Sequence, residues 1–125
     1  MITQPEQLRN RTKDFALRIV RLFRELPKKD EARMIGKQVF RSGTSVAANY
    51  RAVCRARSKA EFIAKMGIVV EEIDETVFWL ELLVETRIIA EARMKSLLKE
   101  AQELLAIFAA SHITARKKQG RKVLQ

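Results

Sequence analysis

At 125 residues the chain is long enough for one domain with a substantial hydrophobic core, and its 47% hydrophobic content argues against disorder. A formal net charge of +10 favours polyanionic partners. No apolar run approaches the roughly 18 residues that a membrane span needs, and residues 1–11 lack the apolar stretch of a signal peptide. Since a single cysteine also excludes an intramolecular disulfide, we expect a cytoplasmic protein without a membrane contact.

The charge is unevenly distributed along the chain. Residues 31–60 hold 7 Lys and Arg against 1 acidic residue, whereas residues 61–90 hold 2 against 7. The second quarter of the sequence should therefore attract polyanions, and the third quarter should repel them.

The first predicted helix covers about residues 8–26 and ends at Pro27, which lacks the backbone N–H that a helix needs. Apolar side chains recur along it at helical spacing, which indicates that one face packs on a core. These are Leu8, Phe15, Ile19, Leu22 and Leu26. The cationic residues on its other faces are interpreted as solvated charges, because surface helices carry such residues routinely.

The second predicted helix, about residues 30–57, carries two different faces, and Asp30 is its expected N-cap. With about 100° of rotation per residue, five cations fall within an arc of about 80°. We name them the basic stripe, which consists of Arg33, Lys37, Arg41, Arg51 and Arg55. The core-facing arc consists of Ile35, Val39, Gly43, Val46, Tyr50, Val53 and Cys54.

The third predicted helix, about residues 59–86, has apolar side chains on two sides. Its start fits a capping box formed by Ser58 and Glu61. Its core stripe consists of Phe62, Met66, Val69, Ile73, Val77, Leu80 and Val84. Off this stripe, a mixed apolar and acidic surface suggests a homo-oligomer interface formed by Ile68, Phe78, Trp79, Leu82, Glu71 and Glu75. The alternative is that Phe78 and Trp79 pack within a wide core of the same bundle.

The fourth predicted helix covers about residues 91–116. The following segment, residues 116–125, is basic, contains a glycine and has little to bury, so we expect it to be disordered. Four amphipathic helices with short connections predict an all-α domain over residues 1–115, in the form of an antiparallel up-down-up-down four-helix bundle.

The sequence offers little catalytic or metal-binding chemistry. His112, the single histidine, lies on the apolar arc of the fourth helix and is interpreted as a packed side chain. Cys54 lies on the core-facing arc of the second helix, where a thiol usually acts as a small hydrophobe. Metal sites in bundles need inward-facing carboxylates and Glu-x-x-His pairs, whereas the acidic cluster of the third helix faces away from its core stripe. That cluster consists of Glu71, Glu72, Asp74 and Glu75. We therefore expect no enzymatic activity, no metal and no cofactor.

The basic stripe has two interpretations. It extends over about 33 Å at 1.5 Å per residue, and arginine is well suited to phosphate because its planar fork donates two parallel hydrogen bonds. No aromatic residue interleaves the stripe, so contact with RNA or DNA would involve backbone phosphates with little reading of sequence. Alternatively, the stripe pairs with the acidic third helix of the same chain or of a neighbour. The two roles can coexist.

Three blocks of the sequence resemble one protein family. Residues 38–51, QVFRSGTSVAANYR, resemble its signature, and residues 54–65 and 71–83 resemble its second and third blocks. The signature positions are Arg41, Ser42, Ser45 and Asn49. The family comprises small bacterial four-helix-bundle proteins encoded in intervening sequences of large-subunit ribosomal RNA genes, and the resemblance covers residues 15 to about 110.

The resemblance implies a four-helix bundle that assembles as a homopentamer and has no established enzymatic activity. It also implies kinship with the accessory variability protein of diversity-generating retroelements, a basic pentameric barrel that binds nucleic acid and a reverse transcriptase. By position it makes Trp79 and Phe78 a subunit-contact pair. Ala52 and Val53 depart from the Glu-Ala of many relatives, which makes the stripe more basic here.

Two functions remain open on this basis. The first is a non-enzymatic homo-oligomer that binds RNA or DNA through backbone phosphates with the basic stripe. The second is a structural or accessory scaffold that docks a protein partner, such as a reverse transcriptase or a ribosomal component, through the same face.

Overall fold

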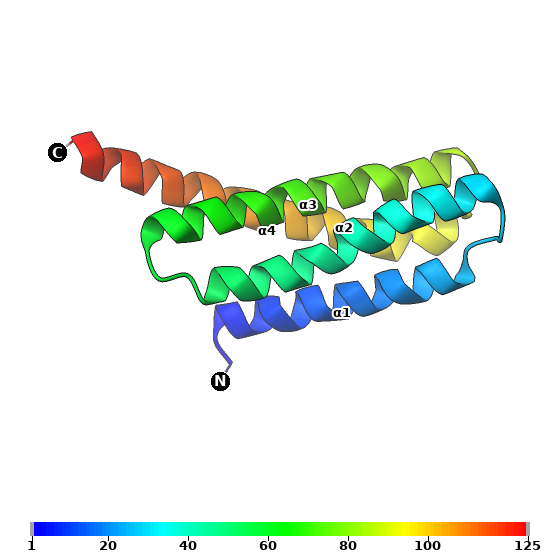
Figure 1. The fold of residues 1–125 in the computed structure, drawn as a ribbon, viewed down its shortest axis with the longest axis horizontal. Coiled ribbons are helices and arrows are strands. Elements are labelled where there is room, and N and C mark those ends of the chain that lie inside the picture. The colour runs from blue at the N-terminus through cyan, green and yellow to red at the C-terminus, as the bar shows by residue number, and fades with distance from the viewer. Residues whose placement is uncertain (1, 125) are drawn as a thin grey trace.

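Four α-helices form an up-down bundle in the computed structural model, which describes residues 2–124 and the side chains as far as Arg121 (Figure 1). The helices are α1 (Gln4–Glu25), α2 (Asp30–Cys54), α3 (Lys59–Glu85) and α4 (Glu91–Leu124). Helices that follow one another in sequence pack together along their lengths, whereas the backbones of α1 and α4 approach each other at few positions. The predicted all-α, up-down architecture is confirmed.

Helix α1 begins four residues before the predicted start at Leu8 because a capping box precedes its apolar stripe. The backbone N–H of Glu6 donates to Thr3 Oγ1 at 3.3 Å, and the backbone N–H of Thr3 donates to Glu6 Oε2 at 3.0 Å. Pro5 suits this first turn, where its missing N–H costs nothing. The helix ends at Glu25, two residues before Pro27.

The connection between α2 and α3 ends at Ser58, which caps the N-terminus of α3. The backbone N–H of Glu61 donates to Ser58 Oγ at 3.1 Å, which confirms the predicted N-cap of α3. The carboxylate of Glu61 pairs with Lys65 Nζ at 2.7 Å. Helix α2 ends at Cys54, three residues earlier than predicted, and it begins with Asp30 as its first helical residue rather than as its N-cap.

Glycines allow α1 and α2 to approach closely. A Cβ added to Gly43 would lie 2.8 Å from Ile19 Cγ1, and one added to Gly36 would lie 2.5 Å from Leu26 Cδ1. Both distances are shorter than van der Waals contact, so there is no room for a Cβ atom at either position and only glycine fits without displacing its neighbour. The contact with Ile19 explains why a glycine occupies position 43 on the core-facing arc of α2.

Helix α4 continues to Leu124, so residues 116–124 are helical and not disordered as the sequence predicted. Arg, Lys and Gln dominate this segment and are good helix formers, and no proline interrupts it. In Figure 1 the orange and red part of α4 extends past the connection between α2 and α3. Helix α4 is therefore longer than the bundle that it joins.

Candidate nucleic-acid interface

The basic stripe lies on the outer surface of α2. All five of its side chains are exposed, since the opposite arc of the helix faces the core through Val39, Val46 and Val53. Within residues 2–121, four stripe cations take part in no ion pair: Arg33, Lys37, Arg51 and Arg55. The predicted exposure of the stripe is confirmed for every member.

Arg41, the fifth member, is bound to the neighbouring helix. Its guanidinium Nη1 lies 3.5 Å from Glu72 Oε2, and its Nη2 donates to Glu75 Oε1. Glu75 Oε1 also accepts the indole N–H of Trp79 at 3.2 Å. The ion-pair interpretation of the stripe therefore holds for Arg41 within one chain, while the other four cations remain open to solvent.

These contacts shift the protonation equilibria of the two carboxyls in opposite directions. The hydrogen bond from Arg41, followed by the one from Trp79, holds the pKa of Glu75 below its usual value. Desolvation by burial raises the pKa of Glu72, and the positive charge of Arg41 opposes that rise. Glu75 is thus the principal partner of the Arg41 guanidinium, and Glu72 is a peripheral one.

Beside this ion pair, two signature positions serve packing and helix geometry. The hydroxyls of Ser42 and Thr76 are hydrogen-bonded at 2.8 Å, and both residues are fully buried between α2 and α3. Asn49 Nδ2 donates to the carbonyl oxygen of Ser45 at 2.9 Å, within α2. Of the signature residues, Arg41 and Ser42 therefore join α2 to α3, and Asn49 bonds within α2.

The predicted oligomer interface on α3 is partly exposed. Phe78 is 55% exposed and Ile68 43%, and Glu71 is also exposed, whereas Trp79, Leu82 and Glu75 are half-buried. Phe78 packs edge-on against Trp79 with ring centroids 4.9 Å apart, and Trp79 packs against the core. The wide-core alternative thus describes Trp79, and the outward-facing description fits Phe78 and Ile68.

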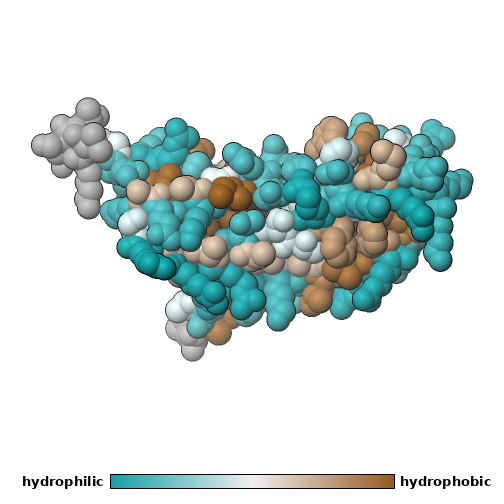
Figure 2. All heavy atoms as spheres, in the orientation of Figure 1, coloured by the Kyte–Doolittle hydropathy of each residue, from teal (hydrophilic) through white to brown (hydrophobic). Residues whose placement is uncertain are grey.

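Two exposed apolar residues of α2 escaped the sequence analysis. Met34 is 70% exposed and Phe40 is 38% exposed, with the Phe40 ring edge-on to Phe23 at 5.1 Å. Helical rotation places both outside the core-facing arc, and this signal was available in the sequence. In Figure 2, brown hydrophobic surface interrupts the teal hydrophilic surface over the end of the bundle where α2 begins and α3 ends.

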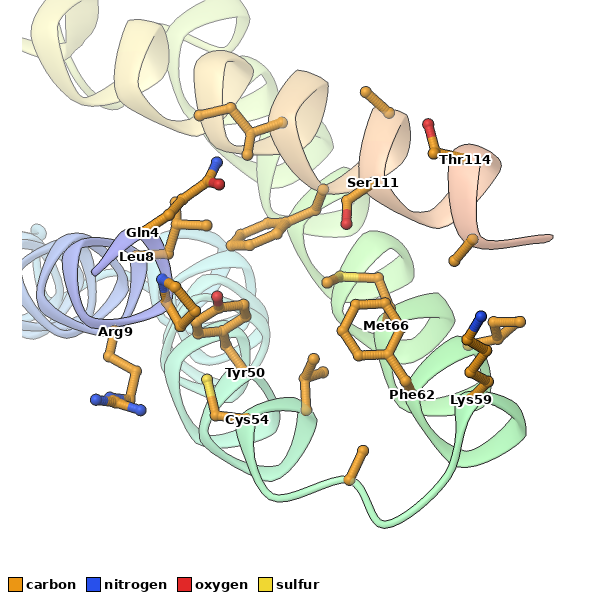
Figure 3. Close-up of a pocket in the computed structure, with 18 of the residues that line it drawn as sticks. Gln4, Leu8, Arg9, Tyr50, Cys54, Lys59, Phe62, Met66, Ser111 and Thr114 are labelled. Carbon is orange, nitrogen blue, oxygen red and sulfur yellow. The ribbon is translucent and has the colours of Figure 1, made fainter. Parts of the chain in front are cut away.

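A hollow of about 1110 Å³ opens at the other end of the bundle, between the start of α1, the end of α2, the start of α3 and the second half of α4. Figure 3 shows Tyr50 facing Phe62 and Met66 across it. Cys54 also lines the hollow and is half-buried rather than buried as predicted. Burial raises the pKa of the Tyr50 phenol, and the adjacent Cys54 thiol adds to the rise. No pattern in the sequence predicted this hollow.

His112 is half-buried against the neighbouring helix, since a Cβ on Gly67 would lie 3.3 Å from its Nε2 atom. Among the side chains that the structure describes, no group of three or more His, Cys, Asp or Glu is arranged to hold a metal ion. Over the same part of the chain, no helix has both the length and the apolar character to cross a membrane.

Residues 6–110 match the family described as 23S rRNA-intervening sequence protein. The chain belongs to this family. It is similar to a crystal structure from Bacteroides thetaiotaomicron described as a protein of unknown function from the S23 ribosomal protein family. The two share 35% identity with a TM-score of 0.77, over 83% of this chain and 96% of the other. No curated protein matches the chain.

The match to the intervening-sequence protein family therefore confirms the resemblance seen in the three sequence blocks. The matched region ends at residue 110, within α4. Residues 111–124 of α4, which carry the basic extension beyond the bundle, lie outside it.

Proposed function

We propose that this intervening-sequence protein binds RNA or DNA through backbone phosphates, without catalysis. The contacts are the four unpaired cations of the basic stripe, Arg33, Lys37, Arg51 and Arg55. The observation that carries the proposal is that these side chains are exposed along one helix face and have no carboxylate partner within residues 2–121. Exposed arginines without partners can exchange water for phosphate oxygens at little cost in existing interactions.

Arg41 has a different role in this proposal. It holds α2 against α3 through Glu75 and Glu72, so it fixes the orientation of the helix that presents the other four cations. A side chain already bound to two carboxylates would have to break those contacts before it reached a phosphate.

The proposal is tested by fluorescence anisotropy with mixed-sequence single-stranded RNA across a salt series. Log affinity should fall linearly with log salt, and Arg51→Gln with Arg55→Gln should reduce that slope by about 1.4, since each phosphate contact on a single strand contributes about 0.7. The matched control is Lys95→Gln with Lys99→Gln, which removes the same charge from exposed positions of α4. Equal losses in both variants, or binding insensitive to salt, would exclude the stripe as the phosphate site.

A second candidate is docking of a protein partner on the same face, for which the resemblance suggests a reverse transcriptase or a ribosomal component. Met34 favours it, because a 70% exposed methionine beside the stripe cations offers apolar contact that phosphate does not use. Salt-insensitive capture of such a partner, abolished by Met34→Ser, would favour this candidate over nucleic acid.

We also propose that the chain assembles as a homo-oligomer through the outer face of α3, as a pentamer if the resemblance extends to stoichiometry. Phe78 and Ile68 support this, because large exposed apolar residues on a helix that already packs on its other side indicate a partner. Phe78→Ser should lower the mass measured by light scattering, whereas Leu17→Ser, an exposed apolar residue on α1, should not. An unchanged mass in Phe78→Ser would exclude this face.

A further inference from the structure

We propose that the hollow at the end of the bundle binds a single-chain fatty acid, with the acyl chain inside and the carboxylate at the mouth. This site is separate from the basic stripe and from the α3 face. Its size, its apolar wall and the position of its cations each support the assignment.

The wall of the hollow is built from all four helices. Aliphatic and aromatic side chains supply most of it, including Leu8, Val53, Phe62, Met66, Ile107 and Phe108. The volume of about 1110 Å³ is slightly above the range of about 300–1,000 Å³ that is typical of small-ligand pockets, so it has room for a long chain. A wall of this composition favours a flexible hydrocarbon over a polar metabolite, which would leave its hydrogen-bonding groups unsatisfied.

The hollow exists because α4 diverges from α1 at this end of the bundle. Beyond the hollow the two helices are joined by ion pairs, with Arg11 bound to Glu100 next to it and Arg93 bound to Glu25 at the far end of the bundle. Toward residue 118, α4 instead continues past the bundle and forms one side of an open trough. Seven residues of α4, the first Ile107 and the last Lys118, border the hollow, and they extend over about 16 Å at 1.5 Å per residue.

Cations gather at the mouth of the hollow rather than in its depth. Arg57 lies in the connection between α2 and α3, and Lys118 lies on the α4 extension; both line the hollow and both are exposed. The contact of Gly67 with His112 sets the register of the antiparallel pair α3 and α4, so Lys118 lies near the level of the start of α3. Arg57 and Lys118 are therefore close to the same opening, whereas Figure 3 shows Arg9 extending away from it.

An apolar interior with cations at its opening, Lys59 among them, matches a hydrocarbon chain that ends in an anion. The α4 end of a second copy is a poor match for the mouth, because that end carries Arg116, Lys117, Lys118 and Arg121 and like charges repel each other. The hydroxyl of Ser111 points into the hollow in Figure 3. The carboxylate of a bound fatty acid would thus balance the positive charge at the mouth, where no acidic residue among those that the structure describes lines the hollow.

The first experiment is a calorimetric titration of the full chain with decanoate, dodecanoate and tetradecanoate, each below its micelle concentration. Affinity should rise by up to about fourfold per methylene, which corresponds to about 0.8 kcal/mol per buried CH₂. Binding should saturate at one ligand per chain with helix content unchanged in circular dichroism. Affinity that does not depend on chain length, no saturable binding, or loss of helix content would overturn the proposal.

The second experiment uses variants that keep the core intact. Ser111→Trp fills the hollow and should weaken dodecanoate at least tenfold, whereas Ala106→Trp, exposed on α4 outside the hollow, should not. Arg57→Gln with Lys118→Gln should abolish the preference for dodecanoate over its uncharged methyl ester, and Lys95→Gln with Lys99→Gln should preserve it. Equal effects of the hollow and control variants, or a lower oligomeric mass in Ser111→Trp, would assign the hollow to another role.

The single cysteine provides a readout that needs no substitution. Cys54 lines the hollow and is the chain's only thiol, so its alkylation by iodoacetamide reports occupancy directly. Saturating dodecanoate should slow the alkylation at least tenfold, and methyl-β-cyclodextrin, which removes the fatty acid, should restore it. An unchanged rate at saturation would place the ligand elsewhere and overturn the assignment.

Discussion

The guanidinium of Arg41 on α2 is hydrogen-bonded to the carboxylate of Glu75 on α3. This pair lies beside the buried hydroxyl contact of Ser42 with Thr76, so a charged bond on the surface and a neutral bond in the interior join the same two helices at one level. The arrangement explains why two adjacent signature residues are an arginine and a serine.

The Arg41–Glu75 pair should contribute modestly to stability. Both side chains are partly exposed, and exposed ion pairs contribute about 0.2–1 kcal/mol. Arg41→Gln, Glu75→Gln and the double variant, unfolded in urea, should give a coupling free energy in that range. A coupling near zero would mean that the two groups act independently in solution.

The contribution of Glu75 should depend on pH in the acid range. Its pKa is lower in the folded than in the unfolded protein, so its contribution to the free energy of unfolding is present above about pH 4.3 and is lost as pH falls through the folded-state pKa. The difference in unfolding free energy between the wild type and Glu75→Gln should therefore shrink from about pH 6 to about pH 3.

Glu72 provides the comparison for that measurement because its pKa is shifted upward. Its contribution is present at low pH and is lost as pH rises through the folded-state pKa, so Glu72→Gln should become relatively more favourable toward neutral pH. The same pH trend in both variants would contradict the opposite shifts.

The buried hydroxyl pair should be the more costly one to disrupt. Thr76→Val keeps the side-chain shape but removes the partner of Ser42 Oγ, whose other contact, to the carbonyl of Val39, is long at 3.5 Å. We expect a loss of about 1–3 kcal/mol, as for a buried polar group left poorly satisfied. Adding Ser42→Ala should recover part of this loss in urea unfolding, and purely additive losses would show that the two hydroxyls are not coupled.

Alanine should have opposite effects at two glycines. Gly43→Ala places a Cβ 2.8 Å from Ile19 Cγ1 and should cost about 1–3 kcal/mol in thermal or urea unfolding. Ile19→Ala in the same chain should make that substitution less harmful, since it removes the clashing atoms. Gly120→Ala meets nothing within 4 Å and should increase helix content in circular dichroism without lowering the unfolding midpoint.

Periodicity alone predicted the four helices and the exposure of the basic stripe, because both depend on rotation within a single helix. The acidic third helix was one predicted partner of the stripe, but the particular carboxylates that bind Arg41 could not be predicted, since they depend on the register of two helices and lie 31 and 34 positions away. The hollow was unpredictable for a related reason: it arises from the divergence of α1 and α4, and no local pattern encodes an angle between distant helices. The early start of α1 could have been predicted from the sequence, because Thr3 and Glu6 have the spacing of a capping box and Pro5 is typical of a first helical turn.

Because Arg41 is bound to carboxylates, the available cations of the basic stripe form two pairs, Arg33 with Lys37 and Arg51 with Arg55. Lys37 and Arg51 are fourteen positions apart, which is about 21 Å along the helix axis. A stacked strand advances about 3.4 Å per nucleotide, so an oligonucleotide of fewer than about six nucleotides can touch one pair only. Two-point attachment therefore sets a minimum ligand length, and affinity should increase sharply once an oligonucleotide can bridge both pairs.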